Sequence, residues 1–160
     1  MKNSTLLLFV LLTNSYLGFA QFSAGNSISV MSPNGALSKT HNFGIGLNGN
    51  IEYGFKEDKF GHLVSEIGYS IWSSKEGNQI KDNLNSFSLM LGYRAPLFKS
   101  VYIETRFGQY FGDLNGFVVI PAIGVRMGNL DLNLGVTINN HSPQFVNTRV
   151  AYFWARKKSS

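Results

Sequence analysis

The sequence contains no cysteine, which excludes disulfide bonds and thiolate metal sites. Charged residues are also scarce: Asp, Glu, Lys and Arg make up 14% of the chain, against about 25% in ordinary soluble domains. A small soluble protein needs more charge than this to cover its surface with polar groups. The composition therefore favours a protein that keeps much of its surface away from water.

The chain opens on a short apolar run, LLLFVLL at residues 6–12, which is too short to span a membrane as a helix. Lys2 precedes this run, and the small residues Gly18 and Ala20 occupy the −3 and −1 positions of a cleavage site. This arrangement is typical of a secretory signal peptide. We therefore predict a cleaved signal peptide over residues 1–20 and export through the Sec pathway.

The remaining residues, 21–160, are predicted to form one domain built from β-strands. Apolar and small or polar residues alternate along it with period two, most clearly in NFGIGLNGNIEYGF at residues 42–55. Side chains of a strand point alternately to its two faces, so each such segment has one apolar face. The predicted strands cover residues 22–31, 42–55, 62–73, 84–94, 101–111, 117–127, 130–138 and 145–154.

Gly128-Asn129 is the strongest hairpin signal in the sequence. A two-residue loop pairs Met127 with Leu130, so the apolar positions must change from odd to even, and they do. The same pairing sets Arg126 opposite Asp131, where they can form a cross-strand ion pair. An even number of antiparallel strands also places both termini at the same end of the strands.

Charge distribution indicates which face meets lipid. On the predicted strands from residue 42 onward, the apolar face carries no charge, and the opposite face carries Glu52, Glu66, Glu104, Arg106, Arg126, Asp131 and Arg149. A charge turned toward lipid costs about 2–4 kcal/mol near the midplane, so the charged face must line the lumen. Open sheet edges cannot persist in hydrocarbon either, so the sheet must close. We predict an all-β protein, an eight-stranded antiparallel up-and-down transmembrane β-barrel whose lumen holds a structural ionic network.

This pattern, with the AQ pair at residues 20–21 and the YRAPLF turn at residues 93–98, resembles small bacterial outer-membrane barrels of the OmpA, OmpX and OmpW type, including those of Bacteroidota. The resemblance implies a place in the cell outer membrane. The chain departs from the family pattern in two places. A basic tail follows Trp154, where such barrels usually end on an aromatic residue, and Pro121 inside a strand suggests a bulge.

No catalytic, cofactor-binding or metal-binding residues are predicted, and we expect no enzyme activity. His41, His62 and His141 are not clustered in the sequence and lack metal-ligand spacing. The formal net charge of +5 comes from basic residues scattered over turns at both ends, so we expect no nucleic-acid partner. Lysines in turns near anionic lipid head groups explain this charge better.

The leading hypothesis is a monomeric outer-membrane protein with a structural or interaction role. Its partners would be membrane lipid and an envelope protein bound through loops 32–41, 74–83, 112–116 and 139–144. One alternative is a soluble periplasmic barrel similar to lipocalins, with the apolar face turned inward around an apolar ligand. A second alternative is a lipid A-modifying enzyme, because His141-Ser142 is similar to part of the lipid A deacylase site.

Overall fold

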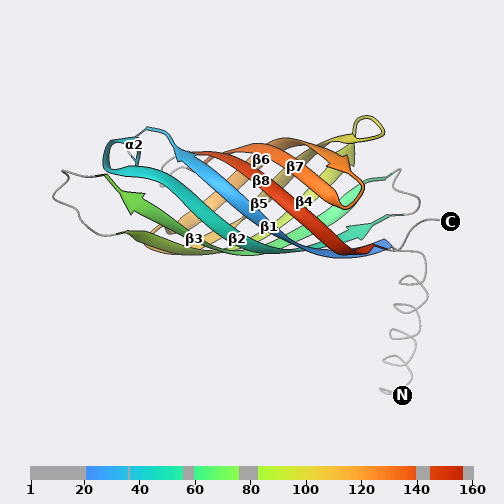
Figure 1. Ribbon diagram of the computed structural model, residues 1–160, viewed down its shortest axis with the longest axis horizontal. Coiled ribbons are helices and arrows are strands. Elements are labelled where there is room, and N and C mark those ends of the chain that lie inside the picture. The colour runs from blue at the N-terminus through green and yellow to red at the C-terminus, as the bar shows by residue number, and fades with distance from the viewer. Residues whose placement is uncertain (1–20, 36, 56–59, 76–82, 140–144, 157–160) are drawn as a thin grey trace, which may run out of the picture.

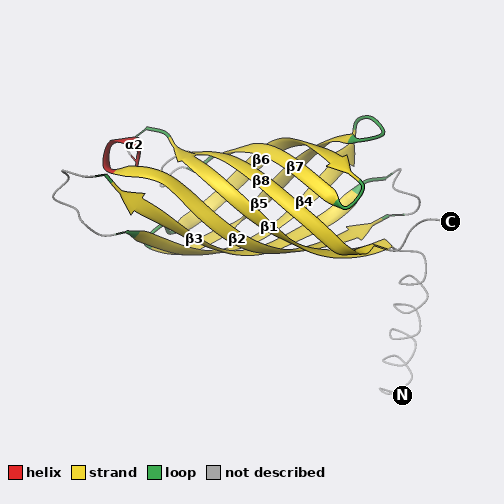
Figure 2. Ribbon diagram, in the orientation of Figure 1, coloured by secondary structure: helices red, strands yellow, loops and turns green. Residues whose placement is uncertain are grey.

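The computed structural model describes residues 21–35, 37–55, 60–75, 83–139 and 145–156. These ranges are almost entirely β-strand, with one short helix (Figure 2). The elements are β1 (Gln21–Pro33), α2 (Leu37–Thr40), β2 (His41–Gly54), β3 (His62–Ser74), β4 (Leu84–Pro96), β5 (Val101–Gly112), β6 (Gly116–Met127), β7 (Leu130–Thr137) and β8 (Phe145–Arg156).

The strands form a closed antiparallel barrel, as predicted. Each strand pairs with the next along the chain, and β1 pairs with β8 to close the sheet (Figure 1). One end of the barrel, here called the terminal end, holds the start of β1, the end of β8 and the β6–β7 turn. The opposite end, here called the loop end, carries α2.

The β6–β7 hairpin has the predicted register. Met127 pairs with Leu130, and Arg126 pairs with Asp131. Gly128 has a φ of 63°, a left-handed conformation that glycine adopts without steric cost. The change of apolar parity across this turn therefore follows from its length, as the sequence predicted.

The bulge expected at Pro121 is absent, and that prediction is wrong. Pro121 pairs in register with Thr105 of β5, and its side chain faces outward. On the β7 side, Val119 pairs with Ile138 in the register of the main ladder, and this pair exchanges two hydrogen bonds. Because proline has no N–H to donate, the ladder is interrupted at Pro121 without any shift in register. Register shifts occur instead at Ala24/Gly25 and between His41 and Gly44.

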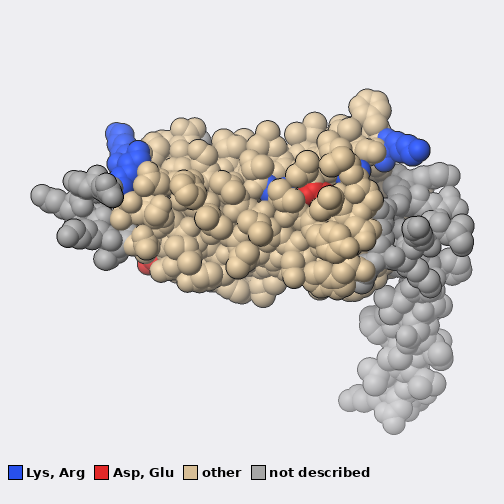
Figure 3. Space-filling model, in the orientation of Figure 1, with Lys and Arg blue, Asp and Glu red and all other residues tan. Residues whose placement is uncertain are grey.

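The outer wall of the barrel is apolar. Leu89, Ile103 and Leu132 point outward with exposed fractions of 51%, 46% and 42%. Among the described side chains of the strands, none on this outer face is charged. Figure 3 shows a largely tan wall, with the larger blue patches of Lys and Arg at the two ends. Within the described ranges, no helix has the length and apolar character needed to cross a membrane.

The lumen at the loop end is filled by apolar side chains, which period-two alternation of the strands does not predict. Trp72 is fully buried and packs edge-on against Phe145, with ring centroids 4.9 Å apart. It lies directly against Gly44, where a Cβ would come within 2.5 Å of the indole ring. The loop-end cluster, as we call it, comprises Met31, Leu37, Trp72, Met90, Tyr110, Leu114, Val118, Ile120 and Phe145.

Replacing Trp72 by alanine tests the loop-end cluster. The change would open a cavity among packed side chains, so we expect the free energy of unfolding to fall by about 3–5 kcal/mol. Trp154→Ala is the matched control, because Trp154 is the other tryptophan of the chain and faces outward. The measurement is urea-induced unfolding of the folded barrel in lipid vesicles. Equal losses for the two variants would contradict a packed lumen at this end.

Candidate functional site: the lumen ionic network

All seven charged residues predicted for the lumen lie there, and Arg94 of β4 joins them. These eight residues form what is here called the lumen network: Glu52, Glu66, Arg94, Glu104, Arg106, Arg126, Asp131 and Arg149. They project inward from seven strands, β2 to β8. Seven of the eight are buried, and Arg126 has 13% of its side chain exposed. Four carboxylates face four guanidinium groups, so the lumen network carries no net formal charge.

Glu104 lies at the centre of the lumen network and contacts three arginines. One carboxylate oxygen, Oε2, lies 2.5 Å from Nη2 of Arg94. The other, Oε1, lies 2.9 Å from Nε of Arg106 and 3.0 Å from Nη2 of Arg149. The Glu104 side chain is completely buried. A buried carboxylate is tolerated only when it is paired and hydrogen-bonded, and Glu104 meets both conditions.

Toward the terminal end, Arg126 links two carboxylates. Its Nη1 and Nη2 atoms donate to both oxygens of Glu52 at 2.7 Å, and Nη2 also donates to Asp131 at 2.9 Å. Arg94 contacts the same two carboxylates, at 2.6 Å and 3.0 Å. The Arg126–Asp131 pair is therefore present, but each partner is shared with other charged groups.

Aromatic side chains support this part of the lumen network. The Tyr102 hydroxyl donates a hydrogen bond to Oδ1 of Asp131 at 2.6 Å. The Arg94 guanidinium lies over the Tyr102 ring at 3.9 Å, and that of Arg126 lies over Phe153 at 4.6 Å. A cation over an aromatic face is attracted by the ring quadrupole. These contacts fix the guanidinium planes that the carboxylates bind.

Toward the loop end, Glu66 terminates the lumen network. Its Oε2 atom accepts hydrogen bonds from Arg106 at 2.7 Å and from Arg149 at 2.6 Å. In the β3–β4 ladder Glu66 pairs with Met90, which belongs to the loop-end cluster. The charged and apolar fillings are therefore in adjacent layers of the same lumen.

Arg94 is absent from the predicted set of lumen charges, because the predicted strand ends at residue 94 and Arg94 is counted with the turn that follows. In the structure β4 continues to Pro96, and Arg94 pairs with Glu104 of β5. Its even number continues the inward row of Ser86, Ser88 and Met90. The alternation alone could have placed it in the lumen, and the imbalance of four acids against three bases was a second signal.

The two described histidines, His41 and His62, lie at opposite ends of the barrel. His41 begins β2, is buried, and has its Nδ1 atom 2.8 Å from the Thr40 hydroxyl at the loop end. His62 begins β3 at the terminal end, and His141 lies outside the described residues. Across the described ranges, no group of three or more His, Asp or Glu residues is arranged to hold a metal ion.

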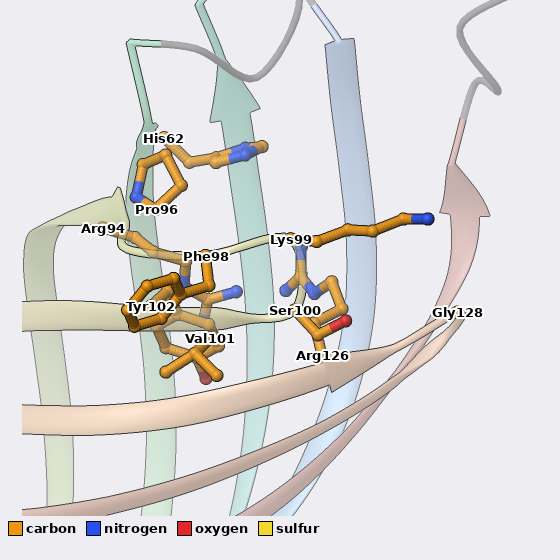
Figure 4. Close-up of a pocket in the computed structure, with 10 residues that line it drawn as sticks. All are labelled: His62, Arg94, Pro96, Phe98, Lys99, Ser100, Val101, Tyr102, Arg126 and Gly128. Carbon is orange, nitrogen blue, oxygen red and sulfur yellow. The ribbon is translucent and has the colours of Figure 1, made fainter.

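A cavity of about 240 Å³ opens above the lumen network at the terminal end (Figure 4). Arg94, Tyr102 and Arg126 line it together with Lys99 and His62. The guanidinium groups that reach it already bind Glu52, Glu104 and Asp131. The cavity is thus a vestibule where the lumen network meets water, with its floor closed by paired charges.

A closed eight-stranded barrel with a filled lumen and an apolar wall is the architecture of small transmembrane β-barrels. No known family model matches the chain, and no curated protein matches its sequence. Solved structures share the fold. A de novo designed transmembrane β-barrel is 14% identical with a TM-score of 0.58, covering 82% of this chain and 94% of its own. Ail, the attachment invasion locus protein of Yersinia pestis, is 10% identical with a TM-score of 0.53, covering 84% and 96%.

Neutralising Glu104 tests the lumen network. In Glu104→Gln three buried guanidinium groups lose their shared carboxylate, so we expect the free energy of unfolding to fall by about 3–5 kcal/mol. Lys99→Gln is the control, because it removes an exposed charge from the turn after β4. Both variants are compared with the parent by urea titration in vesicles. A Glu104→Gln barrel as stable as the Lys99→Gln barrel would contradict the assigned role of the lumen network.

Proposed function

We propose that this protein is an integral outer-membrane barrel, sealed to solutes, with a structural or interaction role exercised through its loops. The observation that carries the proposal is the opposite character of the two faces of its wall. Eight charged side chains are enclosed in the lumen, while the described side chains of the outer face are uncharged. In water this apolar face would promote aggregation, whereas in a bilayer it matches its surroundings.

The strands are long enough for this placement. β2 has 14 residues, which at about 3.3 Å each and a tilt near 45° reach a height of about 33 Å. The apolar band of an outer-membrane barrel is about 25 Å tall. All described lysines lie outside the strands, in α2, just after β3 and in the β4–β5 turn. The charged ends therefore project beyond the apolar band.

The filled lumen supports a role other than conduction. The interior of an eight-stranded barrel is just wide enough for side chains to fill. Here the lumen network occupies one part and the loop-end cluster the other. A solute would have to displace both paired charges and packed aromatic rings. We therefore infer a non-conducting barrel.

The loop end is the proposed contact surface. Two of its connections are anchored in the barrel, since Leu37 of α2 and Leu114 of the β5–β6 turn are buried in the loop-end cluster. A rigid barrel that holds its loops in this way suits a binding role. The name of the Yersinia pestis barrel, attachment invasion locus protein, is in keeping with such a role for this fold.

The lipocalin-like alternative required the apolar row of each strand to point into the lumen. Leu89, Ile103 and Leu132 point outward instead, while Glu104 and Arg126 point inward, so that alternative is wrong. The enzyme alternative depends on His141 and Ser142, which lie outside the described residues. Its test is His141→Ala, followed by mass spectrometry of the lipid A from cells that carry the variant.

Membrane insertion and closure are tested together on the full chain expressed in a bacterium with an outer membrane. We expect the protein to stay with the membrane pellet after a carbonate wash and to migrate differently in gels before and after boiling. Reconstituted into a planar bilayer, it should add no steady conductance. Recovery in the soluble fraction would contradict the membrane assignment, and stable channels would contradict the sealed lumen.

A further inference from the structure

The outer wall has a groove between β2 and β3 near the loop end. Its volume is about 420 Å³. The groove is lined by Phe43, Ile45, Leu47, Tyr69, Ile71 and Ser73, which we call the β2–β3 groove. These side chains form two rows, one on each strand, with Ile45 opposite Ile71 and Leu47 opposite Tyr69.

The β2–β3 ladder is irregular at the part of the groove nearest the loop end. His41 pairs with Ser74 and Gly44 with Trp72, so two residues of β2 lie opposite Ser73 alone. Such a bulge bends its strand and redirects the side chains at that point. The bulge leaves Asn42 and Phe43 both exposed, Phe43 by more than half, and the short Ser73 side chain lies opposite them.

Two lysines flank the loop-end limit of the groove in the sequence, since Lys75 follows Ser73 by two residues and Lys39 precedes Phe43 by four. The backbone N–H of Lys75 donates to the Thr40 carbonyl at 2.9 Å, and the Lys75 ammonium donates to the Ser38 carbonyl at 2.5 Å. Lys39 lies between Ser38 and Thr40 in α2, so the two contacts place Lys75 against the helical turn that carries Lys39. Both lysines are exposed, and Figure 3 shows a blue patch where Figure 1 labels α2. An ammonium has three donor hydrogens, which leaves Lys75 free to bind an anion as well.

We propose that the β2–β3 groove binds an acyl chain of a phospholipid whose head group is a negatively charged phosphate with no cationic substituent, such as phosphatidic acid, and that Lys39 and Lys75 hold this phosphate. The apolar rows match the acyl chain, and the two ammonium groups match the phosphate charge. Basic residues near a membrane surface attract anionic lipid with about 1 kcal/mol each. The site rests on the proposed membrane placement, which sets the groove in hydrocarbon and the lysines at head-group level.

The proposed lipid is the ligand that uses both parts of the site, the apolar groove and the two lysines. An uncharged lipid would fill the groove without using the lysines, and a free phosphate would bind the lysines without using the groove. A substitution at Ser73 distinguishes these cases, because a larger side chain there obstructs the groove and leaves both lysines unchanged. Replacing Lys39 tests the phosphate contact alone, since neither of the two hydrogen bonds that hold α2 to Lys75 involves the Lys39 side chain.

The experiment measures binding of phosphatidic acid to the full-length barrel in phosphatidylcholine nanodiscs, by titration followed with amide NMR signals of β2 and β3. The variants are Lys39→Glu and Ser73→Trp, and the matched control is Lys99→Glu, whose exposed lysine lies at the terminal end. We expect saturable binding, weakened about tenfold in each of the two variants and unchanged in the control.

Binding of similar strength in Lys39→Glu and Lys99→Glu would overturn the phosphate site. Loss in Lys39→Glu with full binding in Ser73→Trp would overturn the groove and leave a phosphate contact alone. Each variant is first checked for heat-dependent gel migration, which reports closure of the barrel. A closed, inserted barrel that does not distinguish phosphatidic acid from phosphatidylcholine refutes this inference alone. Failure of the parent chain to insert refutes the proposed function as well.

Discussion

The structure depends on pairing every charge that the barrel encloses. A buried ion without a partner costs about 3–5 kcal/mol, a large share of the roughly 5–15 kcal/mol that stabilises a domain, so the four carboxylates in the lumen are each met by guanidinium groups. These partners come from distant parts of the chain: Arg126 and Glu52 are 74 residues apart, and Arg149 and Glu66 are 83 apart. Such contacts form only when every strand between them has its correct register. The lumen network therefore stabilises the observed register of β2 to β8 over other registers.

The lumen is closed by two groups of side chains, one charged and one apolar, each filling a different part of it. Charged side chains occupy the part nearer the terminal end, where Arg126 reaches the vestibule and water. Aromatic and aliphatic side chains occupy the part nearer the loop end, where α2 and the β5–β6 turn add Leu37 and Leu114. The apolar layer shields Glu66 from the loop end, and the network gives that layer a rigid base. Together they make the barrel a fixed support for its loops.

Strands, closure and the inward row of charges were all predictable from the sequence, because period-two alternation and the cost of charge in lipid are local and strong constraints. The loop-end cluster was not predictable in this way. Trp72 and Val64 lie on the charged face of β3, and alternation alone gives no reason for an apolar side chain there. The fit of Trp72 depends on side chains from other strands, such as Phe145 and Tyr110, whereas Val64 lies outside that cluster, between Glu52 of β2 and Gly92 of β4 in the sheet. The missing bulge at Pro121 has a similar cause, since neighbouring pairs hold the register that proline cannot support.

The central claim is that oily side chains point to lipid and charged ones to the lumen, and the absence of cysteine makes it directly measurable. Single cysteines at Leu89, Ile103 and Leu132 on the wall, and at Ser86 and Ser88 in the lumen, can carry nitroxide labels in vesicles. Electron paramagnetic resonance then reports collisions with oxygen, which is concentrated in hydrocarbon, and with a water-soluble nickel complex. We expect strong oxygen contact at the three wall positions and weak contact with either reagent at the two serines. Strong nickel contact at the wall positions would contradict it.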